Sequence, residues 1–89
     1  MSEIVRRAVA GTLESSDVYV ELEPSDSGIE VKIDSVVLNQ FGMQIRRVVD
    51  EVLNAQGVTR ARVSLMDRGA LDCVIRARVE TAVMRAKGE

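Results

Sequence analysis

Two adjacent serines, Ser15 and Ser16, stand in a short polar stretch between two predicted strands. An exposed turn presents a hydroxyl that another enzyme can reach, so either serine is a candidate modification site. Serine and aspartate are also ordinary turn residues, because their side chains bond to nearby backbone groups. Taken alone, the pattern favours a plain turn and leaves modification open.

Two glutamates, Glu21 and Glu23, are spaced two apart on a predicted strand and so share one face of it. Paired carboxylates can act as general acid and base, but this face alternates with apolar residues and is expected to be the solvent side. The chain contains no histidine, which removes serine–histidine and cysteine–histidine nucleophiles and the commonest zinc-ligand sets. We therefore predict neither a catalytic site, nor a metal site, nor an independent enzyme.

A lone cysteine and two arginines are the remaining candidates. Cys73 lies in the alternating run Leu71-Cys73-Ile75, on the apolar face of a predicted strand. This position predicts a small buried apolar residue more readily than a nucleophile. Arg76 and Arg78 are able to hold a phosphate or a nucleic-acid backbone. An arginine-rich strand face exposed to solvent is the commoner explanation of such a pair.

Length and composition limit the class of protein. The chain has 89 residues, 46% hydrophobic, with a net charge of −2, which predicts one folded domain over residues 1–89. Tyr19 and Phe41 are the only aromatic residues, so base-stacking surfaces and nucleic-acid binding are not expected. No apolar run approaches the roughly 20 residues of a membrane span. A single cysteine fits a reducing compartment, and we predict a cytoplasmic protein.

The elements that must position these residues follow from hydrophobic period. Residues 17–23 and 29–34 alternate apolar and polar side chains, and the Pro24–Gly28 stretch between them has hairpin-loop chemistry. We therefore predict an antiparallel pair. Residues 8–13 form a weaker predicted strand, and residues 60–65 a further strand that ends at the Asp67–Gly69 turn.

A helix is predicted after residue 34, where apolar residues recur every three or four positions, with Ser35 as N-cap and Gly57 as C-terminal stop. Its apolar face comprises Val37, Phe41, Ile45, Val48, Val49 and Val52. Residues 71–79 match a strand and a helix almost equally, with Arg78 discordant in the helical pattern. We favour a strand to about Val79 and a short helix to about Lys87. The predicted fold is α+β: two layers, with a mainly antiparallel sheet of four or five strands covered on one face by one long helix and a C-terminal helix.

Two blocks of sequence resemble the acyl carrier, or gamma, subunits of citrate lyase. The first is Ala10-Gly11-Thr12-Leu13-Glu14-Ser15, followed by Asp17-Val18, and the second is Gly69-Ala70-Leu71-Asp72-Cys73 with its continuation Ile75-Arg76-Ala77-Arg78-Val79-Glu80. Gln40-Phe41-Gly42 and Ile45-Arg46 between them are similar as well. The likeness thus spans nearly the whole chain.

The resemblance implies a non-catalytic carrier of citrate lyase, modified on Ser15. In that family a serine bears 2'-(5''-phosphoribosyl)-3'-dephospho-CoA through a phosphodiester, installed by a prosthetic-group transferase. The thiol of this group holds an acetyl or citryl thioester. The alpha subunit (transferase) exchanges acetyl for citryl on the carrier, and the magnesium-dependent beta subunit (lyase) cleaves the citryl thioester to oxaloacetate.

One departure from the family pattern leaves two alternatives for the site. The family usually has glycine after the modified serine, whereas this chain has Ser16. Ser15 is assigned over Ser16 by the motif and not by chemistry. For the function, the alternatives are a carrier of the malonate decarboxylase type and an unmodified phosphate-binding or assembly module.

Overall fold

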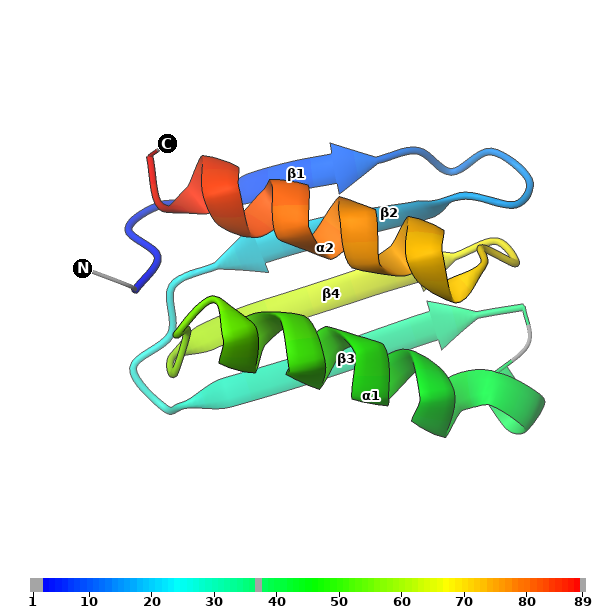
Figure 1. Cartoon of the computed structure of the whole chain (residues 1–89), viewed down its shortest axis with the longest axis horizontal. Helices are drawn as coiled ribbons and strands as arrows, with labels where there is room; N and C mark the ends of the chain where they lie inside the picture. Colours follow the sequence, from blue (N-terminus) through cyan, green and yellow to red (C-terminus); the bar gives the residue numbers. More distant parts are fainter. Residues whose placement is uncertain (1–2, 37, 89) are drawn as a thin grey trace.

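Four strands and two helices form two layers, in which both helices cover the same face of one sheet (Figure 1). The computed structural model describes residues 3–36 and 38–88, without the side chains of residues 38–40. The elements in chain order are β1 (Ala8–Gly11), β2 (Val18–Glu23), β3 (Ile29–Ser35), α1 (Leu38–Ala55), β4 (Ala61–Asp67) and α2 (Asp72–Ala86). The predicted α+β, two-layer architecture is confirmed, with four strands.

The order of the strands in the sheet is β1-β2-β4-β3. β2 is antiparallel to β1 and to β4, whereas β3 is parallel to β4 and is linked to it through α1. The sheet is therefore mixed, and the predicted β2–β3 pair is wrong because β4 lies between these two strands. The loop between β2 and β3 crosses the start of β4, where the Ala61 N–H donates to the Gly28 carbonyl at 3.0 Å.

Charge on the helix-free face gives a physical reason for this order. Glu23 of β2 and Glu30 of β3 are both in register with Arg62 of β4. The Arg62 guanidinium lies 2.9 Å from Glu23 and 3.7 Å from Glu30. Opposite charges across strands are favourable and like charges are not, so a strand that places Arg62 between the two glutamates is preferred to direct pairing of the two acidic strands.

α1 is the predicted amphipathic helix with a later start. It buries Ile45, Val48, Val49, Val52 and Leu53, while Phe41 is 51% exposed and Val37 lies outside the described residues. Ser35 is not its N-cap, because this residue ends β3 and its hydroxyl donates to Asp67 Oδ2 at 2.7 Å. The predicted stop at Gly57 is confirmed.

The C-terminal end of α1 has the hydrogen bonds of a Schellman motif. The Val58 N–H donates to the Leu53 carbonyl and the Gly57 N–H to the Asn54 carbonyl, at 2.9 and 3.1 Å. Gly57 has φ = 72°, which glycine adopts readily.

α2 begins at Asp72, so the predicted strand to Val79 is wrong and the helical alternative holds. Ile75, Val79, Ala82, Val83 and Ala86 form its buried stripe. The stripe packs on β1 and β2 beside α1. The hydrophobic period could not decide between strand and helix here, because Leu71, Ile75 and Val79 are apolar positions in both repeats.

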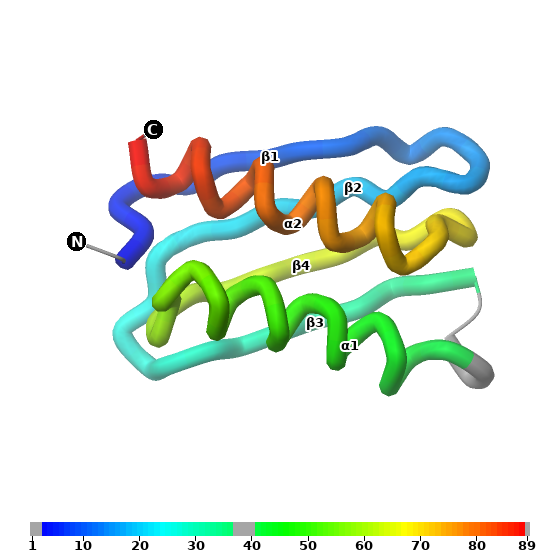
Figure 2. The backbone as a smooth tube through the Cα atoms, in the orientation of Figure 1, coloured from blue at the N-terminus to red at the C-terminus, as the bar shows by residue number. Residues whose placement is uncertain are grey.

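The β1–β2 loop and the β4–α2 loop lie at the same end of the sheet, where β3 also ends and α1 begins (Figures 1 and 2). The two termini and the other loops lie at the opposite end. Ser15 and Ser16 belong to the β1–β2 loop, so the candidate site lies at the first of these ends.

Gly11, at the end of β1, is where the hairpin closes most tightly. Its φ is 90°, and a Cβ at this position would lie 1.8 Å from the Val18 carbonyl oxygen. That oxygen is backbone and cannot move aside without disturbing β2. Gly11 is therefore required both by conformation and by space.

We expect Gly11→Ala to lower the free energy of unfolding by more than about 2 kcal/mol, because strain and a backbone clash add. Gly28→Ala is the matched control, since Gly28 has the same φ of 90° and a Cβ at that position would have no atom within 4 Å. It should lose only about 1 kcal/mol. Urea denaturation measures both, and equal losses would contradict the close approach.

Candidate functional site

The β1–β2 loop, residues 12–17, presents the two candidate serines. Leu13, Glu14, Ser15 and Ser16 are all exposed. Among the residues that the structure describes, neither serine hydroxyl has a hydrogen-bond partner. Both hydroxyls are thus accessible to a modifying enzyme, and exposure alone does not distinguish them.

The two serines are the central residues of a four-residue turn. The Asp17 N–H donates to the Glu14 carbonyl at 3.1 Å, which closes the turn around Ser15 and Ser16. Ser16 has φ = 66° and is the only non-glycine residue with a positive φ in the described part of the chain. Type II turns require a positive φ at this third position, which favours glycine. The usual family glycine after the modified serine therefore matches the backbone that Ser16 adopts here.

Backbone hydrogen bonds join the turn to the β4–α2 loop. The Ser16 N–H donates to the Arg68 carbonyl at 2.8 Å, and the Arg68 N–H donates to the Asp17 carbonyl at 2.9 Å. These bonds continue the β2–β4 ladder past the ends of the strands. The position of the serines is thus set by the sheet.

Asp17 fixes the base of the loop through four hydrogen bonds to its carboxylate. Oδ1 accepts from the Val18 N–H at 2.7 Å and from Arg78 Nε at 3.0 Å, and Oδ2 accepts from Thr12 Oγ1 at 2.7 Å and from Arg78 Nη2 at 2.9 Å. Two parallel bonds from one guanidinium are the strong, bidentate form of an ion pair. The Arg78 bonds, followed by the Thr12 bond, lower the pKa of Asp17 to about 2.

The sequence pattern offered Arg78 as a phosphate-binding or solvent-exposed residue and did not pair it with Asp17. Arg78 is discordant in the helical pattern because it borders the buried stripe of α2 and extends across to the loop. That discordance was the signal that could have identified it. Thr12 belongs to the first block of sequence that resembles the acyl carrier subunits, but the resemblance assigned it no role.

The other candidate charged residues lie away from the serine loop and form ion pairs within the chain. Glu21 pairs with Arg7 at 3.2 Å, and Glu23 pairs with Arg62 on the open face of the sheet, as predicted for the solvent side. Arg76 of α2 pairs with Glu51 of α1 at 2.6 Å.

Cys73 is exposed, so the prediction of a buried cysteine is wrong. The prediction assumed a strand, and the helix that forms instead places Cys73 in its first turn, away from the stripe. Across residues 3–36 and 38–88 there is no cluster of three potential metal ligands. Neither helix in that same range is long and apolar enough to cross a membrane.

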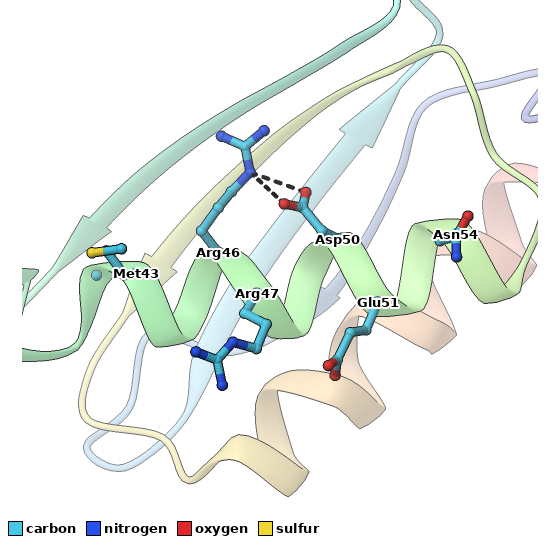
Figure 3. A pocket seen from close by; sticks show the side chains of 7 residues that line it. Met43, Arg46, Arg47, Asp50, Glu51 and Asn54 are labelled. Carbon is cyan, nitrogen blue, oxygen red and sulfur yellow. Dashed lines mark hydrogen bonds and ion pairs between the residues drawn. The ribbon is translucent and has the colours of Figure 1, made fainter.

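A shallow hollow on the outer face of α1 is a second surface feature (Figure 3). Arg46 Nε pairs there with Asp50 Oδ1 at 3.0 Å, and Met43 is 89% exposed. All of its lining residues belong to α1. It is a charged helix surface and includes no residue of the serine loop.

Comparison with known proteins agrees with this fold and gives the relatives of the chain. The model of a family described as malonate decarboxylase delta subunit (MdcD) matches residues 5–86. The citrate lyase acyl carrier protein of Enterobacter sp. (strain 638) is 53% identical over 87 residues, 98% of this chain and 90% of the relative. That of Vibrio cholerae serotype O1 (strain M66-2) is 58% identical over 85 residues, 94% of this chain and 87% of the relative.

A chain in a crystal structure of a Pseudomonas malonate decarboxylase hetero-tetramer in complex with malonate has the same fold. Its TM-score is 0.80 at 24% identity, covering 91% of this chain and 84% of that chain. A small body with an accessible loop and no histidine is suited to delivering a group to other proteins. The chain belongs to the family of acyl carrier proteins that includes those of citrate lyase and malonate decarboxylase. It is a non-catalytic carrier subunit, and membership implies a covalently bound prosthetic group and partner subunits.

We expect Ser16→Gly to raise the free energy of unfolding by about 0.5–1 kcal/mol, because it relieves a left-handed conformation at the expense of extra freedom in the unfolded chain. Ser15→Gly is the matched control, because Ser15 is not at positive φ and glycine relieves no strain there. The extra freedom of the unfolded chain should therefore lower the free energy of unfolding by about 0.5 kcal/mol. Thermal and urea unfolding measure both. If Ser16→Gly destabilises as much as Ser15→Gly, the assigned turn is wrong.

The Asp17–Arg78 pair should make stability depend on pH in the acidic range. The folded pKa of Asp17, about 2, lies below the ordinary aspartate value of 3.8, so its contribution is complete above about pH 4 and disappears as the pH falls through about 2. Asp17→Asn should therefore cost about 2 kcal/mol near neutral pH and almost nothing near pH 2. Urea unfolding across this range tests it.

Asp50→Asn is the control for this measurement, because Asp50 forms an exposed pair within one helix. Such pairs contribute well under about 1 kcal/mol. A pH-independent loss in Asp17→Asn would contradict the role of the ion pair.

Proposed function

We propose that this chain is the carrier subunit of a citrate lyase and bears phosphoribosyl-dephospho-CoA through a phosphodiester on Ser15 Oγ. The observation that carries the proposal is an exposed Ser15 hydroxyl without an internal partner among the described residues, on a loop that Asp17 and Arg78 brace. Relatives at 53% and 58% identity are named citrate lyase acyl carrier proteins, which supports citrate as the substrate class.

The prosthetic group supplies a thiol that holds acetyl or citryl as a thioester. Ser15 Oγ bonds to the phosphorus of an activated phosphoanhydride precursor of the group. The phosphorus–oxygen bond to the phosphate-type leaving group breaks in the same step, and the hydroxyl proton passes to the transferase or to solvent. The braced loop then fixes the point of attachment, while the tether allows the thioester to reach more than one partner. Tethering keeps the thioester near those partners at an effective concentration in the millimolar range or above. The carrier itself needs no acid or base for this role.

The partners in this proposal are the alpha and beta subunits of citrate lyase and the prosthetic-group transferase. Glu14 is exposed in the loop beside Ser15 and has no ion pair among the described residues. It is therefore available to dock on basic patches of those partners, where charge adds mainly to orientation and association rate. Asp17 is occupied by Arg78 and is not a free docking acid. The cytoplasmic location stays a prediction.

A carrier of the malonate decarboxylase type is the second candidate. The matched family description names the malonate decarboxylase delta subunit, and the structural neighbour comes from such an enzyme. Reconstitution separates the two: citrate cleavage with citrate lyase alpha and beta subunits supports our proposal, whereas activity only with malonate decarboxylase subunits supports the alternative.

Intact mass after co-expression with the modifying enzymes tests the attachment. We expect the mass of one prosthetic group on the wild type and on Ser16→Ala, and none on Ser15→Ala, because only one hydroxyl is used. Circular dichroism of Ser15→Ala controls for folding. An unmodified wild type beside competent enzymes, or an adduct that survives Ser15→Ala, would contradict the assignment.

A further inference from the structure

A pocket of about 560 Å³ opens between the first turns of α1, the first turns of α2 and the β4–α2 loop. This volume lies within the range of small-molecule sites. Apolar side chains form most of its lining: Phe41, Ile45, Ala70, Leu71 and Ile75. Ile75 is 1% exposed and Ile45 is 2% exposed, so the pocket reaches the core, while Phe41 and Leu71 at 51% and 71% remain accessible to solvent.

The pocket adjoins the loop that carries Ser15. The Ser16 N–H donates to the Arg68 carbonyl at 2.8 Å, and the next residue, Gly69, lines the pocket. Both loops lie at the same end of the sheet (Figure 1). A flexible group on Ser15 therefore starts beside this pocket.

The charge of the lining limits the occupant. Asp67 and Asp72 are its acidic residues, and within the described part of the chain none of its lining residues is basic. A ligand with free carboxylates would lose water there without gaining a cationic partner, which is unfavourable. A neutral, partly apolar group suits the lining better.

We propose that this pocket receives the sulfur end of the prosthetic arm, as free thiol or acetyl thioester, and excludes the citryl thioester. The proposal rests on attachment of the group at Ser15. Burial of Phe41 and Leu71 surface against the arm favours the docked form, and the tether makes even weak contacts sufficient. The acetyl carrier rests docked, and the citryl carrier extends toward its partners.

Cys73 lines the same pocket and is exposed, so it reports whether the arm is there. The loaded carrier, freed of its acyl group, is equilibrated with reduced and oxidised glutathione. The arm thiol and the Cys73 thiol each lose one proton and one electron as their sulfurs join, and oxidised glutathione takes up these two protons and two electrons to leave as two reduced molecules. Mass spectrometry without reductant gives the effective molarity of the two thiols.

Two matched comparisons distinguish docking of the arm in the pocket from random encounters of a long, undocked arm with any nearby thiol. In Cys73→Ser with Asp34→Cys, the partner thiol is at the same end of the sheet but on its helix-free face. We expect the wild-type effective molarity to be at least about tenfold higher than in that variant. Ala70→Leu, which fills the pocket, should lower it several-fold, whereas Ala77→Leu on the exposed side of α2 should leave it unchanged.

The acetyl and citryl carriers give an independent test, because the arm thiol is capped in both and only Cys73 can react with iodoacetamide. Alkylation should be several-fold slower in the acetyl form. Equal effective molarities at the two cysteine positions, or equal alkylation rates, would overturn the pocket assignment. A chain that acquires no group on Ser15 would instead contradict the proposed function.

Discussion

The Asp17–Arg78 ion pair is the contact on which the serine loop depends. It joins two residues 61 positions apart, one at the base of the loop and one on α2. Asp17 uses both of its oxygens, and the same carboxylate also holds Thr12 and the Val18 N–H. Because α2 packs on β1 and β2, the pair fixes the loop to the core. The exposed serines therefore stand on a rigid base.

Around that pair, the sequence is constrained by space and conformation. Gly11 lets β1 approach the Val18 carbonyl, and the Arg78 side chain passes close by, with its Cδ 3.3 Å from where a Cβ on Gly11 would lie. Ser16 takes a left-handed conformation to bond with Arg68. The loop is thus defined by contacts from three parts of the chain. A carrier benefits from such a base, because the loop fixes the point at which the arm begins and the flexible arm reaches the partners.

Local pattern predicted most of the elements but not how they assemble. Alternation of apolar and polar residues placed β2, β3 and β4, and Gly57 marked the end of α1, because each of these signals is local in the sequence. β1 was only a weaker prediction over residues 8–13, and the strand spans Ala8–Gly11. The β2–β3 pairing was wrong because strand order depends on non-local contacts, here an Arg62 between Glu23 and Glu30. The start of α2 was wrong because its apolar residues fit two periods, and this error also misplaced Cys73. Ser15 came from the family resemblance, whereas its support by Arg78 required the three-dimensional structure.

Attachment of the prosthetic group to Ser15 of the braced loop is the proposal on which the carrier function depends. Trypsin cleavage after Arg7 and Lys32 releases a single peptide, residues 8–32, that contains Ser15, Ser16, Ser25 and Ser27. Fragmentation of this peptide from the loaded carrier locates the added mass. We predict that the whole addition lies on Ser15. An addition on Ser16, or at any other residue, would contradict that proposal.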